Sequence, residues 1–171
     1  MSNATPLPTA RLAALALLAL LLLCPAPAAA MSARPSQQPE EAEPVKPDDA
    51  DALAQYQVLR EYFERQATLD DRLPEVFSRR VVREETMAFI AMRETVNRRG
   101  NLERIRMGKV DLSGLSFRRV TADPDLARIQ VTGSYTINVP PLVETLEEDA
   151  LFVLLPEMGQ WKIFERREGW R

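Results

Sequence analysis

A strict alternation of apolar and polar residues over residues 128–139 constrains the fold of this chain more than any other feature. The odd positions carry Ile129, Val131, Gly133, Tyr135, Ile137 and Val139, and the even positions are polar throughout. Successive side chains of a strand point to opposite faces, so this segment predicts a strand with one dry and one wet face. Such strands are typical of antiparallel sheets that are covered on one side only. Pro140-Pro141 ends the strand, because proline cannot donate to the ladder.

The apolar spacing before Gly100 is helical instead. A first helix is predicted to begin after the acidic residues near position 49, with one apolar stripe. The stripe consists of Leu53, Tyr56, Leu59, Phe63 and Ala67. Residues 73–77 predict a short second helix with Pro74 in its first turn.

A third helix is predicted over residues 83–99. Its buried side would carry Met87, Ile90, Ala91 and Val96, and Gly100 would end it in the left-handed conformation. Because these residues recur at helical spacing, we expect them to pack against the remainder of the domain.

After Gly100 the apolar period changes to two. Pairs of apolar residues alternate with polar neighbours at Ile105 and Met107, Val110 and Leu112, and Leu115 and Phe117, with a turn at Ser113-Gly114. The apolar run 150–155 and the segment that begins at Trp161 predict the last two strands. Helices followed by strands indicate an α+β fold, with the helices packed on one face of a curved antiparallel sheet of about four to six strands. We expect residues 52–171 to form this single domain.

This layout resembles the nuclear transport factor two-like superfamily of cone-shaped domains. The local similarity lies in the aliphatic strand Leu151-Phe152-Val153-Leu154 and in the closing segment Gly159-Gln160-Trp161-Lys162-Ile163. The resemblance spans residues 52–168, and another cystatin-like sheet is the alternative. It implies a cavity between helices and sheet that serves either as an enzyme pocket or as a binding surface. Phe89, Phe117, Tyr135 and Trp161, on faces expected to point inward, would then line a ligand cavity or form plain core.

The absence of histidine excludes most of the familiar catalytic and metal centres. No imidazole base, no His-activated nucleophile and no His-ligated metal can be built, and the single Cys24 cannot form a disulfide within the chain. We therefore predict no catalytic residue, no metal site and no cofactor. An isomerase-like arrangement would need an inward carboxylate beside a phenol such as Tyr135, and the pattern identifies no such carboxylate.

Four carboxylates are gathered within residues 144–149. Glu144, Glu147, Glu148 and Asp149 could supply oxygen ligands to a weak Ca²⁺ site, but the glycine and the alternating acids of an EF-hand loop are missing. We expect these side chains to be solvated in the approach to a hairpin.

The first thirty residues are typical of a secretory signal sequence. Arg11 precedes an unbroken Ala/Leu run over residues 12–23, and small residues lead to a cleavage site near Ala30. The run is too short for a transmembrane helix, so no membrane anchor is expected in the mature form. This predicts a secreted or periplasmic protein. Acylation of Cys24 is the weaker alternative, because Leu22 and Leu23 do not fit a lipobox.

Residues 31–51 are rich in proline and carry six acidic against two basic residues, which is typical of a disordered spacer. Residues 52–171 are neutral overall and so lack the charge expected of a nucleic-acid-binding domain, although residues 79–119 are basic. We expect an exported noncatalytic cell-envelope domain that binds a protein partner or a small apolar ligand. A histidine-free, cofactor-independent isomerase or dehydratase is the alternative, and the oligomeric state stays open.

Overall fold

The computed structural model describes residues 49–169 and has the α+β architecture expected from the sequence. The expected signal sequence, Cys24 and most of the expected spacer lie outside the described residues. Helices come first and a five-stranded antiparallel sheet follows. The elements are α2 (Ala50–Thr68), η2 (Leu73–Val76), α3 (Val82–Arg98), α4 (Leu102–Arg106), β1 (Lys109–Asp111), β2 (Leu115–Asp123), β3 (Leu126–Val139), β4 (Leu142–Glu157) and β5 (Gln160–Glu168).

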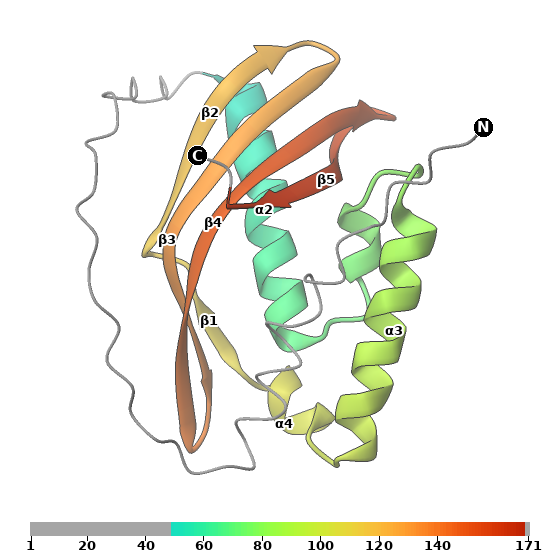
Figure 1. Ribbon diagram of the computed structural model, residues 1–171, viewed down its shortest axis with the longest axis vertical. Coiled ribbons are helices and arrows are strands. Elements are labelled where there is room, and N and C mark those ends of the chain that lie inside the picture. The colour runs from blue at the N-terminus through green and yellow to red at the C-terminus, as the bar shows by residue number, and fades with distance from the viewer. Residues whose placement is uncertain (1–48, 170–171) are drawn as a thin grey trace.

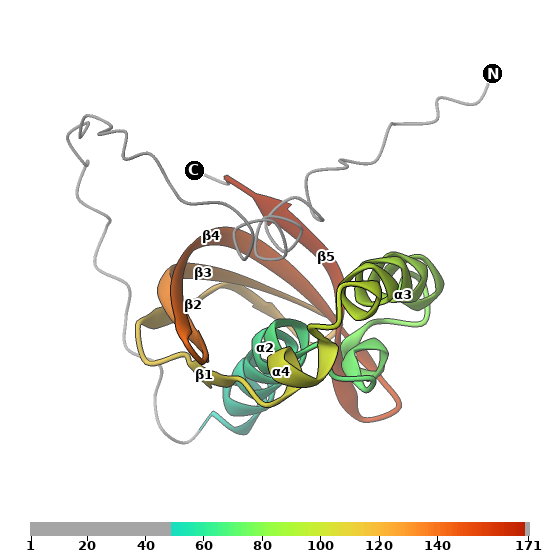
Figure 2. The same ribbon diagram turned by 90° about the horizontal axis from the view of Figure 1, so that it is seen from below.

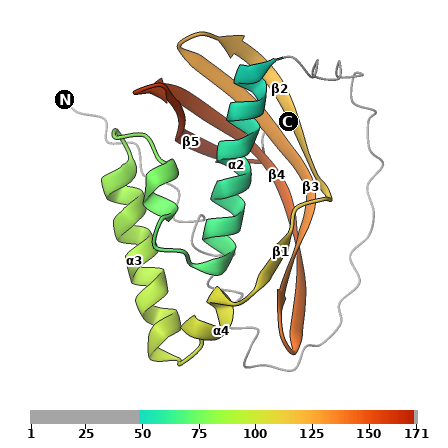
Figure 3. The same ribbon diagram turned by 180° about the vertical axis from the view of Figure 1, so that it is seen from behind.

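The helices occupy one side of a strongly curved sheet. Figure 2 shows the sheet bending around α2, and Figure 3 shows α2 lying across the strands with α3 at the periphery. The core between α2 and the sheet is aromatic, with Phe63 and Phe152 at its centre and ring centroids 5.8 Å apart. None of the helices within residues 49–169 combines the length and the apolar character needed to cross a membrane.

Helix α2 begins at Ala50, inside the segment expected to be a spacer. Asp49 caps it, because the Asp49 carboxylate accepts a hydrogen bond of 3.0 Å from the Ala52 amide. The expected stripe is only partly right, since Leu53 is 55% exposed and the buried face runs instead through Ala52, Gln55, Leu59, Phe63 and Ala67. Ala52 and Gln55 lie on the buried side although one is small and the other polar, so the hydrophobic pattern does not mark that side of the helix.

The expected buried face of α3 is wrong except for Val96. Met87, Ile90 and Ala91 are exposed, whereas Phe89 and Val96 are buried. The sequence of α3 carries apolar side chains on both sides, and helical periodicity alone does not say which side meets the core. Gly100 follows the end of α3 in the left-handed conformation, with φ +72°, as expected.

Ile105 and Met107 do not belong to a strand. Ile105 lies in the short helix α4 and is buried together with Leu102, while Met107 follows the helix and is exposed. Short apolar segments fit a helical and an extended period equally well. Here the segment forms the helix α4, which packs against α2 and α3. The second helix is confirmed as a single 3-10 turn, η2, with Pro74 near its start.

The buried face predicted for the strand over residues 128–139 is confirmed. Ile129, Val131, Ile137 and Val139 are buried, and β3 is the central strand to which β1, β2 and β4 pair. Strands β1 and β2 share one edge of β3, and the turn between them meets β3 at Gly133 (Figure 1). Gly133 has φ +111°, and a Cβ there would lie 2.2 Å from the Gly114 carbonyl oxygen. Only glycine allows this close approach.

Strands β4 and β5 complete the sheet and differ from a regular ladder at one point. Val153 pairs with Glu165 and Leu154 with Ile163, so Phe164 is the extra residue of a β-bulge. Trp161 and Ile163 are buried, as expected from their shared parity. Beyond the bulge the parity of β5 changes, so that Arg166 lies opposite the inward residue Phe152.

Candidate functional site

The four predicted site residues are spread along the core. Phe89 lies on α3, Phe117 on β2, Tyr135 on β3 and Trp161 on β5, and all four belong to or pack against one apolar cluster. The ring of Phe117 stacks at 5.7 Å on Tyr56. The ring of Tyr135 packs at 5.3 Å on Phe63 of α2. In both ring pairs the partner is a residue of α2 and not another of the predicted site residues.

A buried ion pair beside Tyr135 is the most distinctive polar feature of the interior. Glu148 of β4 has a side chain only 5% exposed, and Arg166 of β5 approaches it. The Arg166 Nη2 atom donates to both carboxylate oxygens, at 2.8 and 3.1 Å. The guanidinium also lies 5.8 Å from the centre of the Phe152 ring and donates from Nη1 to Glu168 at 2.5 Å. A charged pair therefore stands at the edge of the aromatic core.

The expectation of a solvated acidic run is wrong for Glu148, which is an inward carboxylate that the sequence pattern did not identify. Glu148 shares its parity with Phe152 four residues later, and both point to the face that α2 covers. This parity was the signal in the sequence that could have identified Glu148. Arg166 could not be found in this way, because the bulge at Phe164 reverses the parity within β5.

The electrostatics of this site follow from burial and from the two charges. Burial raises the pKa of Tyr135, and the negative charge of Glu148 raises it further, so the phenol stays protonated. Burial also raises the pKa of Glu148, while the Arg166 guanidinium acts in the opposite direction. The site thus holds a protonated tyrosine near a carboxylate that is paired with its own cation.

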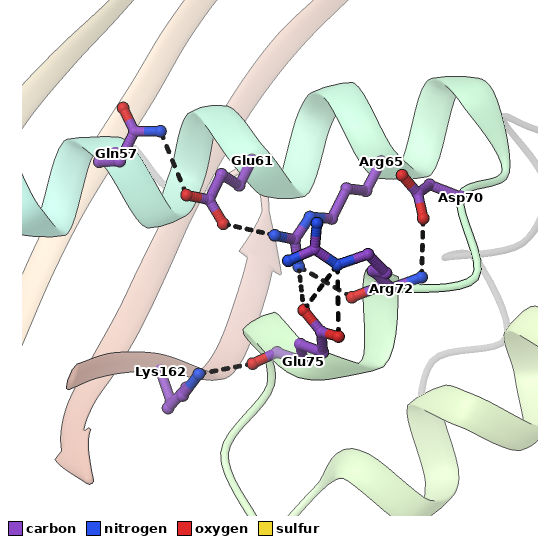
Figure 4. Close-up of polar contacts among 7 residues, drawn as sticks. All are labelled: Gln57, Glu61, Arg65, Asp70, Arg72, Glu75 and Lys162. Carbon is purple, nitrogen blue, oxygen red and sulfur yellow. Dashed lines mark hydrogen bonds and ion pairs between the residues drawn. The ribbon is translucent and has the colours of Figure 1, made fainter. Parts of the chain in front are cut away.

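Two further polar clusters hold the helices on the sheet. Arg119 of β2 donates from Nη1 to the Asp49 cap at 2.6 Å and from Nε to the buried Gln55 at 3.1 Å, which fixes the start of α2. On the other side Arg65 of α2 bonds to Glu61 and to Glu75 of η2, at 2.8 and 3.2 Å (Figure 4).

Lys162 of β5 extends the second cluster. Its ammonium donates at 2.6 Å to the Glu75 carbonyl oxygen, and Figure 4 shows η2 held between α2 and β5. Each cluster satisfies polar groups between elements that are distant in the sequence. We therefore assign both clusters to structure.

Ser78 joins the start of α3 to the β4–β5 hairpin. The Ser78 hydroxyl donates to Glu157 at 2.6 Å, and the second oxygen of Glu157 accepts from the Arg79 amide at 3.1 Å. The Ser78 amide donates to Ile163 of β5 at 2.8 Å, which closes this junction. The hydrogen bond from Ser78, followed by that from Arg79, lowers the pKa of Glu157 below its ordinary value.

This junction predicts an acid-dependent loss of stability. Because Glu157 has a lowered pKa in the folded state, its contribution is complete above its ordinary pKa of 4.5 and is lost as the pH falls through the folded value. Glu157→Gln should cost about 1 kcal/mol at pH 7, since the carboxylate is partly exposed. Urea unfolding between pH 7 and pH 3 measures the effect. The difference between parent and variant should shrink in acid, and a constant difference would contradict the assignment.

The described residues offer no metal centre. Within residues 49–169 no group of three or more acidic side chains is placed to hold a metal ion. Comparison with known proteins does not supply a function either, because no protein-family model and no curated protein matches the chain. The candidate site is therefore defined by its geometry, as a buried Glu–Arg pair beside a protonated tyrosine.

Proposed function

We propose that the chain is an exported, noncatalytic binding protein of the cell envelope, with a cone-shaped domain of the nuclear transport factor two-like type. The α+β architecture with helices on one face of a curved sheet agrees with that layout. The signal-like first thirty residues support export.

The observation that carries the noncatalytic assignment is the engagement of Glu148. Both of its carboxylate oxygens accept hydrogen bonds from Arg166. The guanidinium stabilises the charged form of the carboxylate and so makes it a weaker acceptor for a substrate proton. A carboxylate held by a guanidinium in this way acts as the buried counter-ion of Arg166, whose other acidic partner, Glu168, is 45% exposed.

We place the binding surface at the apolar end of the β3–β4 hairpin. This surface consists of Met107, Pro140, Pro141, Leu142 and Val143. All five are exposed, Met107 by 75% and Val143 by 65%. Met107 lies near the hairpin, because a Cβ at the next residue, Gly108, would lie 2.8 Å from Val139 Cγ2. Val139 in turn pairs with Leu142 at the end of the hairpin. In Figures 1 and 3 the hairpin end lies level with α4.

A protein partner suits this surface better than a small ligand. Exposed apolar residues gathered at one end of a domain are typical of protein–protein contacts. The interior offers less to a ligand, because the Tyr62, Phe63 and Phe152 rings already contact one another at 5.2–5.8 Å.

The test uses the full-length gene product with a C-terminal tag, expressed and processed in its own cells. The partner is identified by cross-linking in the cell envelope and is then purified, and its affinity is measured by calorimetry. Val143→Arg should weaken binding at least tenfold, because a charge would be desolvated in an apolar contact. Leu53→Arg, an exposed leucine on α2, is the matched control and should leave the affinity unchanged. Equal affinities for Val143→Arg and the parent would refute this surface.

One observation favours the enzyme alternative. Tyr135 and Glu148 lie on the same inward face of neighbouring strands, which is the pairing of phenol and carboxylate that a cofactor-independent isomerase uses. Deuterium exchange into a panel of cyclic ketones tests it. Exchange catalysed by the parent and lost in both Glu148→Gln and Tyr135→Phe would establish the enzyme, and exchange at the uncatalysed rate supports the binding protein.

A further inference from the structure

The outward face of α3 carries an apolar stripe that nothing in the described part of the chain covers. Met87 and Ile90 are 64% and 42% exposed, and Ala91 beside them is exposed as well. The opposite side of the helix, with Phe89 and Val96, supplies the contacts to the core. Figures 2 and 3 show α3 at the periphery of the domain, so this face is accessible.

The stripe is bounded by opposite charges. Arg83 lies four residues before Met87, and Glu94 lies four residues after Ile90. This spacing places all four side chains along one line of the helix. Both charged residues are exposed, and within residues 49–169 neither forms an ion pair.

We propose that α3 is the contact between two copies of this chain, packed antiparallel about a twofold axis. Reversing the stripe brings Arg83 opposite the partner's Glu94 and Met87 opposite the partner's Ile90. The same two contacts recur on the other side of the axis, as a twofold interface requires. In an antiparallel pair of α3 helices, each cation therefore faces an anion and each apolar side chain faces an apolar side chain.

This charge order is the reason for committing to a second copy. A parallel arrangement would place Arg83 against Arg83 and Glu94 against Glu94, so the stripe also selects the direction of the pairing. Ala91 beside the apolar pair is small and permits the close approach of 8–10 Å that packed helix axes require.

The proposed dimer is a weak one. A contact through one helix stripe buries less than the roughly 800 Å² per partner of a standard stable interface. We therefore expect monomer and dimer to exchange in the micromolar range, with the dimer favoured at high local concentration.

Sedimentation equilibrium of the full-length gene product, purified as its cells process it, tests the proposal. The parent should fit a monomer–dimer equilibrium. Glu94→Arg and Arg83→Glu should each weaken dimerisation at least tenfold, because each places like charges opposite one another. The double variant Arg83→Glu/Glu94→Arg restores opposite charges and should regain the affinity of the parent.

Two further variants separate this surface from others. Ile90→Arg should abolish the dimer, whereas Val143→Arg on the β3–β4 hairpin should leave it unchanged. All substituted side chains are exposed or partly exposed, and an unchanged melting temperature verifies folding. A parent that stays monomeric at every concentration, a dimer that survives Ile90→Arg, or single charge reversals without effect would each overturn the proposal.

Discussion

Replacing Arg166 with Met should lower the free energy of unfolding by about 3–5 kcal/mol. The substitution keeps an apolar side chain but removes the guanidinium that lies over the Phe152 ring and donates to both oxygens of Glu148. Glu148, only 5% exposed, would then be a buried charge without its counter-ion. Urea unfolding followed by circular dichroism measures the loss.

Arg167 provides a matched control on the neighbouring position. It pairs with Glu165 at 2.8 Å, but its side chain is 55% exposed. Arg167→Met should therefore lower the free energy of unfolding far less than Arg166→Met does, because solvent screens an exposed ion pair. The double variant Arg166→Met/Glu148→Leu should recover most of the loss, because it removes both charges. Equal costs for the two arginine variants would contradict the desolvated pair.

Trp161→Ala should cost about 3–5 kcal/mol, through lost burial and the cavity that remains. Trp161 is 9% exposed and lies one position after the start of β5, where the closing strand packs on the core. A domain of this size has a free energy of unfolding of about 5–15 kcal/mol in total, so the variant should be poorly folded.

Denaturant unfolding measures this loss, with Gln160→Ala as the control. Gln160 is exposed and precedes Trp161 directly, so its replacement should change stability by less than about 0.5 kcal/mol. Should Trp161→Ala unfold at the same urea concentration as the parent, the side chain would not be part of the core.

The strands could be predicted where one face is dry and the other wet. The alternation around Val131 and the shared parity of Trp161 and Ile163 predicted the buried face of β3 and of the start of β5. A period of two assigns each residue of a strand to one face of the sheet. Helices α2, η2 and α3 could be located but their buried sides could not be assigned, and α4 was not expected as a helix. Helix α3 has apolar residues on both sides, and the side with Phe89 is buried because α3 packs against η2 and α4.

Only part of the candidate site could be predicted from the sequence pattern. Tyr135 follows from the alternation of β3, and Glu148 could have been found from its parity with Phe152. The inward position of Arg166 depends on the β-bulge at Phe164, and the periodicity of the sequence does not indicate that bulge.

By itself the sequence determined the two long helices and the main strands, where glycine and proline residues end them, and that histidine chemistry is absent. It did not determine the short helix α4, which the alternation of Ile105 and Met107 had indicated as a strand. Only the tertiary structure decided which helix face is buried, which acidic residue of the run 144–149 enters the core, and which arginine balances it. The physical reason is that periodicity and turn residues act locally along the chain. Burial and charge pairing depend instead on contacts between residues such as Glu148 and Arg166, whose strands meet only in the folded sheet.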